Sequence, residues 1–212
     1  MEKPKLIIFD LDGTLVNAYS AIISSFNFTM QQLGYPRQNK RLICRLVGWG
    51  DENLLKPFIK INDLRKATRL YRAHHRTALR RHASLFYGAS ELLVYLRDKG
   101  YKLAIASNRP TLFSWILIRK LNLARYFKYV LCADRLKYGK PHPEILRRIM
   151  DRFALGPRDT IYVGDMVIDA QAGRRAGVRA IIVTTGSSTR AEIKKEKPYK
   201  IIGKIRELAR IL

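Results

Sequence analysis

The chain has 212 residues, of which 41 are Lys or Arg and only 17 are Asp or Glu, so its formal net charge is +24. With 47% hydrophobic residues and no repeat or low-complexity tract, it is neither a disordered segment nor a solenoid. No apolar run reaches the roughly 18 residues that a membrane span requires, and Asp10 and Asp12 interrupt the N-terminal apolar stretch where a signal peptide would be hydrophobic. The sequence therefore predicts a globular, cytoplasmic protein with no membrane partner.

Short apolar runs of the strand type alternate with helical patterns along most of the chain. The first run, residues 6–9, is followed by Asp-Leu-Asp-Gly, which is typical of a buried strand in a parallel sheet. The alternation predicts an α/β fold with a doubly wound parallel sheet, whose ligand crevice lies beyond the carboxyl ends of the strands. Further strands are expected at residues 102–106, 129–132, 160–163, 180–183 and 199–202, and helices at 90–99, 110–121, 143–153, 167–176 and 204–212.

Polar side chains directly follow several of the expected strands. Two carboxylates, Asp10 and Asp12, come after the first strand, and Thr14 lies two residues further on. Any one of these positions also suits a helix N-cap, but the same arrangement in four loops favours a shared site at one edge of the sheet. The other members are Ser107 and Asn108 after the second strand, Lys140 after the third, and Asp165 after the fourth.

Residues 18–84, between the first two expected strands, are too many for a simple crossover and have helical patterns joined by short breaks. We expect them to form a small α-helical cap domain over the crevice. The catalytic core is then expected to consist of residues 1–17 and 85–212, with hinges near residues 15–19 and 83–88.

The last helical stretch of this insertion bears five arginines at intervals of four, three, four and four residues. This spacing puts them on one face, opposite Tyr71. The ordinary interpretation of such a charge run, and the one favoured, is a solvated outer face. A surface for nucleic acid or polyphosphate is the alternative, although no aromatic residue is interleaved with the arginines to stack on bases. The arginine stripe consists of Arg65, Arg69, Arg72, Arg76 and Arg80.

The acid pair after the first strand suits phosphoryl transfer. An ionised Asp10 would attack phosphorus to give an aspartyl-phosphate, while Asp12 would protonate the leaving oxygen and later deprotonate water. A hard divalent cation bound by Asp10, Asp165 and a backbone oxygen would relieve the repulsion between the acids, and Mg²⁺ suits such an oxygen-only site. The remaining contacts to the phosphoryl group are expected from Lys140, Thr14, Ser107 and Asn108.

Four segments resemble, in order and spacing, the four motifs of the haloacid dehalogenase superfamily. They are DLDGT at residues 10–14, SN at 107–108, KPHPE at 140–144 and GDMVID at 164–169. Within the superfamily, the chain is most similar to the phosphoglycolate phosphatase group, which has a C1 helical cap, through VGWG at residues 47–50 and SNRP at 107–110.

The resemblance implies a role for each matching residue. Asp10 would be the nucleophile, Asp12 the acid and base as well as a backbone ligand of magnesium, and Asp165 a magnesium ligand. Lys140 would be the base that neutralises the phosphate. Asp169 would lie behind the ligands and orient either Lys140 or a metal-bound water.

The resulting prediction is a Mg²⁺-dependent phosphatase that hydrolyses a small phosphorylated metabolite, with phosphoglycolate favoured, in a monomer or homodimer. A phosphomutase with the same intermediate stays open, as does a nucleic-acid-associated phosphatase or binding protein that uses the basic cap. Met166 replaces the usual Ser of the fourth motif, which leaves substrate identity in doubt. Arg45, Gly48 and Trp49 are candidate substrate contacts because the corresponding cap loop of relatives faces the active site, although a helix-surface cation and a core aromatic are equal alternatives.

Overall fold

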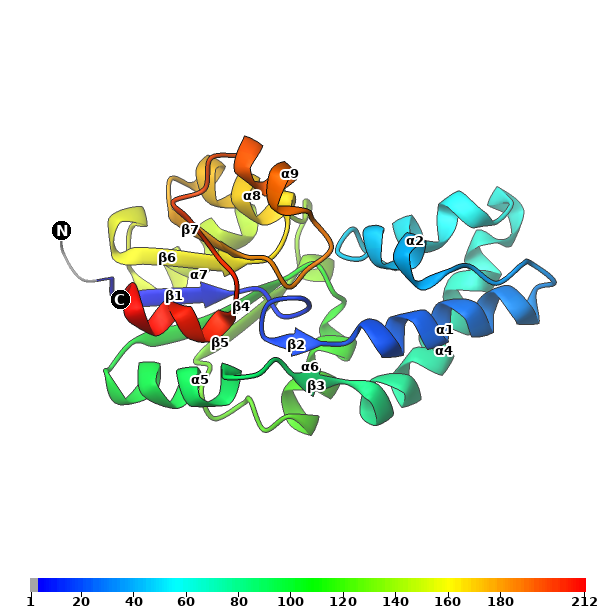
Figure 1. The fold of residues 1–212 in the computed structure, drawn as a ribbon, viewed down its shortest axis with the longest axis horizontal. Helices are drawn as coiled ribbons and strands as arrows, with labels where there is room; N and C mark the ends of the chain where they lie inside the picture. Colours follow the sequence, from blue (N-terminus) through cyan, green and yellow to red (C-terminus); the bar gives the residue numbers. More distant parts are fainter. Residues whose placement is uncertain (1–3) are drawn as a thin grey trace.

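Six parallel strands form the central sheet of the protein, whose structure is a computed structural model that describes residues 4–212 (Figure 1). The strands are β1 (Leu6–Phe9), β4 (Lys102–Ser107), β5 (Tyr129–Cys132), β6 (Thr160–Gly164), β7 (Arg179–Val183) and β8 (Lys200–Ile202). In the order β5-β4-β1-β6-β7-β8, β1 has neighbours on both edges and is buried along its whole length, which explains its continuous apolar run. The predicted doubly wound α/β fold is confirmed.

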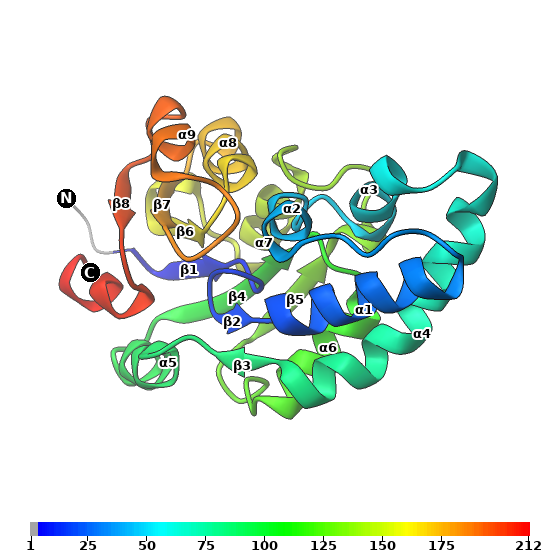
Figure 2. The ribbon, with the colours of Figure 1, turned by 45° about the vertical axis from the view of Figure 1, so that its right-hand side comes forward.

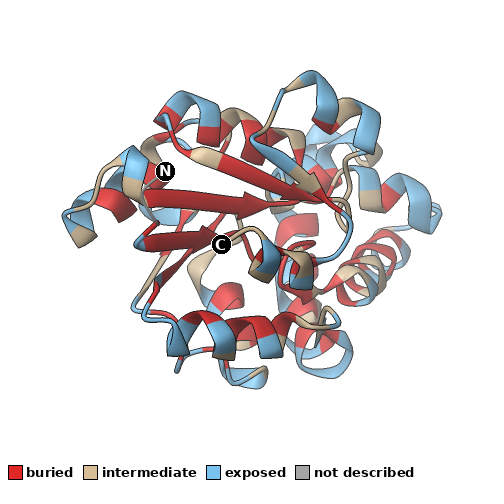
Figure 3. Ribbon diagram, turned by 60° about the vertical axis from the view of Figure 1, so that its left-hand side comes forward, coloured by how far each residue is buried: buried red, intermediate tan, exposed pale blue. Residues whose placement is uncertain are grey.

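Helices cover both faces of this sheet. They are α5 (Ala89–Asp98), α6 (Thr111–Lys120), α7 (Glu144–Phe153), α8 (Val167–Ala176) and α9 (Arg190–Lys195). Leu6 and Ile8 of β1 belong to the apolar cluster that includes α7 and α8, whereas Ile7 and Phe9 belong to the cluster that includes α5 and α6. The central strands β1 and β6 are consequently buried along their whole length, while the covering helices keep exposed residues on their outer faces (Figure 3).

The order of the strands changes direction beside β1. The chain builds outward from β1 through β4 to β5 on one side, and later from β6 through β7 to β8 on the other. The carboxyl ends of β1 and β6 therefore border the point where loops diverge, which is where open α/β sheets bind ligands. Asp10 and Asp165 are the first residues after these two strands.

Between β1 and β4 the chain leaves the sheet through a two-stranded ribbon. β2 (Val16–Asn17) pairs antiparallel with β3 (Ser84–Leu85), so the outgoing and returning segments lie side by side. Beyond the ribbon the chain is helical, and the two longest helices pack against each other (Figure 2). The sequence predicted these helices but not the ribbon, because two-residue strands are too short to show alternation. The helices are α1 (Tyr19–Gln32), α2 (Lys40–Arg45), α3 (Asp51–Leu55) and α4 (Leu64–His82), with 3₁₀ turns η1 (Lys56–Phe58) and η2 (Ile61–Asp63).

The remaining short elements are 3₁₀ turns: η3 (Ala133–Arg135), η4 (Pro157–Asp159) and η5 (Ile205–Arg210). The last of these occupies the position of the expected C-terminal helix, and its Ile205 and Leu208 are buried in the same apolar cluster as α5. Among residues 4–212, no helix combines the length and apolar character needed to cross a membrane.

The contact between α8 and β7 requires glycine at one position, and this gives a test of the fold. A Cβ at Gly173 would lie 2.7 Å from the Cβ of Ala180 on β7. Gly173→Ala should therefore lower the free energy of unfolding by about 1–3 kcal/mol, although alanine favours helix in isolation. Urea denaturation measures the change. Gly156→Ala is the control, because its Cβ would meet nothing within 4 Å; equal stability of the two variants would contradict this packing.

Candidate active site

Two loops bring a pair of carboxylates together at the edge of the sheet. Asp10 begins the loop after β1 and Asp165 the loop after β6, and the Thr14 hydroxyl donates to Asp165 Oδ1 over 2.9 Å. Two glycines permit this approach, since a Cβ would lie 2.3 Å from Asp165 Oδ2 at Gly13 and 1.7 Å from it at Gly186. A larger residue at either position would displace the carboxylate. The contribution of Gly186 was not recognised in the sequence, where no motif surrounds it.

The ammonium group of Lys140 lies between two buried carboxylates. Its Nζ is 2.8 Å from Asp10 Oδ1, 2.8 Å from Asp169 Oδ1 and 3.0 Å from the Tyr162 hydroxyl. Burial by itself would lower the pKa of Lys140, but the two carboxylates outweigh burial and raise that pKa, so the side chain remains a cation at every physiological pH. The structure thus brings three predicted site residues into direct contact.

Each carboxylate oxygen of Asp169 accepts two hydrogen bonds from protein donors. Oδ1 accepts from Lys140 and from the Tyr162 hydroxyl, which is 2.6 Å away. Oδ2 accepts from the backbone N–H groups of Asp165 at 3.1 Å and Met166 at 2.9 Å, which the start of α8 presents to it. The sequence did not predict a role for Tyr162 in the site, because its place in the apolar run of β6 is that of an ordinary core residue.

The charges of this cluster fit a bound divalent cation. Asp10, Asp165 and Asp169 each offer an oxygen within 4.8 Å of the others, and one ammonium group balances only one of the three charges. Burial, and then repulsion from Asp169 and Asp10, raises the pKa of Asp165 well above its usual value; burial also raises the pKa of Asp10 to about 6 despite Lys140. An all-oxygen donor set of this kind suits Mg²⁺. Because Asp169 is saturated, Asp10 and Asp165 are the side chains able to hold the ion.

Asp12 is paired with a cation that the sequence analysis did not assign. Arg109 Nε and Nη2 donate to the two Asp12 oxygens over 2.5 and 2.9 Å.

His75 Nε2, from α4, lies 2.7 Å from Arg109 Nη1, and since a guanidinium group can only donate, this nitrogen is the acceptor. His75 Nδ1 then carries the hydrogen and donates to Ser25 Oγ of α1 over 3.0 Å. The sequence signal that could have identified Arg109 as a site residue was its position immediately after the SN motif.

Ser107 and Asn108, at the end of β4, make different contacts. Ser107 Oγ accepts from the backbone N–H of Arg109 over 3.1 Å, so its own hydrogen stays available for a ligand. The Asn108 side chain donates to Gly48 O at 3.1 Å and Lys140 O at 3.0 Å, and it accepts from the Lys140 N–H at 2.8 Å. Asn108 therefore fixes the Lys140 loop and contacts the helical insertion.

A small cavity of ≈ 50 Å³ lies beside these groups, which is room for about four water molecules. Asp10, Asp12 and Lys140 form its polar side. The opposite side comes from the insertion and is mostly apolar, with Ile22, Leu46, Val47, Gly48, Leu54 and Tyr71 among its residues. The cavity thus lies between the sheet edge and the insertion and is partly open.

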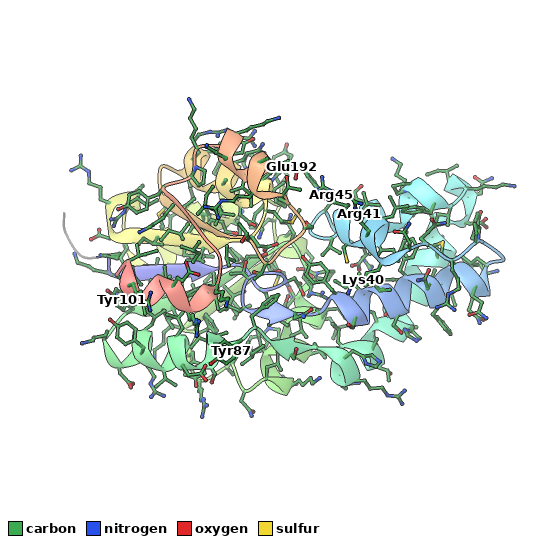
Figure 4. All side chains as sticks on the ribbon, in the orientation of Figure 1. Lys40, Arg41, Arg45, Tyr87, Tyr101 and Glu192 are labelled. Atoms are coloured by element: carbon green, nitrogen blue, oxygen red, sulfur yellow. The ribbon has the colours of Figure 1, made fainter. Side chains whose placement is uncertain are left out.

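Two of the predicted cap residues do not line this cavity. Arg45 extends from α2 toward α9, where its Nη1 and Nη2 donate to the two Glu192 oxygens over 3.0 and 2.6 Å and Nη1 also donates to Ser187 O over 2.8 Å (Figure 4). Trp49 is 45% exposed. Arg45 therefore connects the insertion to the core in this arrangement, whereas Gly48 lines the cavity through its backbone.

An acid pair after a central parallel strand, with a buried lysine and further acids from neighbouring loops, is an arrangement suited to catalysis with a divalent cation. Residues 7–183 match the sequence profile of the family described as "Haloacid dehalogenase-like hydrolase". The chain belongs to this hydrolase family.

Individual relatives match over nearly their whole length. The chain is 27% identical over 220 residues to "Phosphoglycolate phosphatase" of Nitrosococcus oceani, covering 100% of this chain and 98% of the relative. It is 34% identical over 209 residues to "Probable phosphatase IndB" of Dickeya dadantii, covering 96% and 91%. The crystal structure of a predicted phosphoglycolate phosphatase from Haemophilus somnus superposes with a TM-score of 0.93 at 26% identity, covering 100% and 99%.

The contact between His75 and Arg109 predicts a pH dependence of stability. Burial, and then the Arg109 charge, lowers the pKa of His75 from 6.5 to about 2. Below pH 6.5 the His75 side chain therefore binds a proton in the unfolded chain but not in the folded protein. The free energy of unfolding consequently decreases as the pH is lowered below 6.5. The loss should reach about 2 kcal/mol at pH 5.

His75→Gln can still accept from Arg109 but cannot be protonated, so its stability should fall by about 2 kcal/mol less than that of the wild type between pH 7.5 and 5. Chemical denaturation at the two pH values measures this. His82→Gln, which replaces an exposed imidazole of the same helix, should behave as the wild type. If the free energy of unfolding changed equally with pH in the wild type and in His75→Gln, this would contradict the assignment of His75 as a buried, neutral imidazole.

Proposed function

We propose that the protein is a Mg²⁺-dependent phosphatase that hydrolyses a small phosphomonoester through an aspartyl-phosphate on Asp10. The observation that supports this best is the contact between Asp10 Oδ1 and Lys140 Nζ, 2.8 Å apart and both buried beside the cavity. Lys140 binds one oxygen of Asp10, and Oδ2 is left to attack phosphorus. A fixed cation at this place stabilises the charge that develops on the phosphoryl group.

The reaction then proceeds in two steps. An Asp10 oxygen forms a bond to phosphorus while the ester P–O bond breaks, and Asp12 gives a proton to the leaving oxygen. Water next attacks the aspartyl-phosphate, Asp12 takes the proton of that water, and phosphate leaves with Asp10 restored. Magnesium, held by Asp10, Asp165 and the Asp12 backbone, would supply the positive charge that lets two anions approach.

The surrounding residues are assigned from their contacts. Ser107 has a hydroxyl hydrogen available for a phosphoryl oxygen. Thr14 donates to Asp165 and so orients that carboxylate, and Asn108 orients Lys140. In this arrangement Arg109 binds both oxygens of Asp12 at the cavity wall, and this ion pair has to loosen before Asp12 can carry the proton of the first step.

We assign residues 18–84 as a cap domain and residues 1–17 and 85–212 as the catalytic core. The insertion covers the cavity, and the β2–β3 ribbon is a natural hinge because it contains the two covalent connections between the parts. Opening would separate Arg45 from Glu192 and Gly48 from Asn108. Water is excluded when the cap is closed, which favours transfer to Asp10 over side reactions.

Phosphoglycolate is the favoured substrate because the cavity is small and several similar proteins are named phosphoglycolate phosphatase. A cavity of ≈ 50 Å³ favours a small leaving group such as the two-carbon glycolate. Among the described residues that line it, Arg109 and Lys140 are the cations nearest to an anionic substrate, and both are already paired with carboxylates.

A panel of phosphoglycolate, sugar phosphates, nucleotides and 3′-phosphorylated oligonucleotides, assayed for phosphate release with Mg²⁺, tests this proposal. The wild type should release phosphate from at least one compound, and Asp10→Asn should be slower by about 1000-fold or more. Lys140→Ala and Asp165→Asn should also lose most activity. Arg152→Ala, an exposed change on α7, is the control. Equal phosphate release by the wild type and Asp10→Asn would refute the nucleophile.

A further inference from the structure

A second concave surface lies at the junction of α4 and α6. Unlike the acidic cluster, it is lined by cationic and apolar side chains. This groove has a volume of ≈ 730 Å³. Arg76 and Arg80 border it from α4, and Leu112, Trp115, Ile116 and Arg119 border it from α6. It therefore combines part of the arginine stripe with an aromatic side chain that the stripe itself lacks.

Within residues 4–212, no hydrogen bond or ion pair engages the guanidinium groups of this groove. Arg76, Arg80 and Arg119 are exposed, and no carboxylate within residues 4–212 forms an ion pair with any of them. Arg72 of the same stripe is different, because its Nε lies 2.9 Å from Asp51 Oδ2. Arginines four residues apart repel each other along a helix, so an anion that bridges Arg76 and Arg80 would remove a destabilising interaction.

Lys120, which also lines the groove, connects the two helices. Its Nζ donates to Ala83 O over 2.7 Å and to Leu79 O over 3.4 Å, which ties the end of α6 to the C-terminal end of α4. The edge-on contact of His75 with Phe113, whose ring centroids are 5.2 Å apart, adds a second connection between these helices. In this arrangement of insertion and core, these contacts hold the cationic side of the groove against its aromatic side.

The apolar part of the groove is exposed. Trp115 is 38% exposed and Leu112 49%, although both are large apolar residues. An exposed indole in the same groove as several guanidinium groups is a combination suited to single-stranded nucleic acid, in which phosphates contact cations and an unpaired base stacks on the ring. A duplex presents no free base face, and an acidic peptide has no requirement for an aromatic platform.

We propose that the α4–α6 groove binds single-stranded nucleic acid, with Arg76, Arg80 and Arg119 on consecutive phosphates and a base stacked on Trp115. The net charge of +24 attracts any polyanion to the protein as a whole, and the groove supplies the specific contacts. This binding is separate from the proposed phosphatase activity, since no groove residue lines the catalytic cavity.

Binding of a fluorescein-labelled oligo(dT) of about 15 nucleotides, followed by anisotropy, tests the proposal. The triple variant Arg76→Ala, Arg80→Ala, Arg119→Ala should bind at least about tenfold more weakly near 0.1 M salt, and its log–log salt slope should be smaller by about 2. The control triple variant Arg152→Ala, Arg190→Ala, Lys194→Ala removes the same charge from exposed positions on α7 and α9. It should weaken binding by less than about threefold.

Tryptophan fluorescence tests the stacking contact. The chain has two tryptophans, so Trp49→Phe leaves Trp115 as the single reporter. Oligo(dT) should quench it at saturation, and Trp115→Ala should lower affinity about fivefold or more. Equal weakening by the two triple variants would mean general attraction of polyanions and would overturn the proposal. So would an unquenched Trp115, or polyglutamate that binds as tightly as oligo(dT), which would indicate an acidic polypeptide instead.

Discussion

The buried ammonium group of Lys140 is the interaction on which the rest of the site depends. It is shared by Asp10 and Asp169 at 2.8 Å each and joins the loop after β1 to the loop before α7 and the start of α8. Removal of one partner from such a buried ionic group typically costs about 3–5 kcal/mol, because the charges left behind are uncompensated. Since one cation cannot neutralise three acids, the same arrangement that fixes the geometry leaves a deficit that a divalent ion is suited to fill.

The distribution of acids contrasts with the rest of the molecule. Of the 17 Asp and Glu in the chain, Asp10, Asp12 and Asp51 line the cavity, and Asp165 and Asp169 support it. The outer surface is strongly basic, so long-range attraction brings anions to the protein while the interior of the site presents carboxylates. In the proposed mechanism, a metal ion and Lys140 would reconcile the two, because they would provide positive charge at the place where the phosphoryl group reacts.

The sheet and the helices around it could be predicted from the sequence, since they follow from local periodicity. The polar residues at the start of the loops could be located as well, because they come directly after a strand. The sequence was not sufficient for pairings between distant side chains. The ion pair of Arg109 with Asp12 joins positions 97 residues apart, and the approach of Gly186 to Asp165 depends on how two loops fold. Arg45 was a candidate substrate contact, with a helix-surface cation as the equal alternative. In the structure it contacts Glu192, and a pattern along α2 does not reveal which loop of the core lies opposite.

The most direct test of the central claim is a crystal structure of the protein with Mg²⁺ and a phosphoryl mimic such as beryllium fluoride. The ion should lie about 2.0–2.2 Å from oxygens of Asp10 and Asp165, with the mimic on Asp10 and Lys140 still in contact with Asp169. An ion bound elsewhere, or an Asp10 carboxylate turned away from the mimic, would contradict the mechanism derived from this geometry.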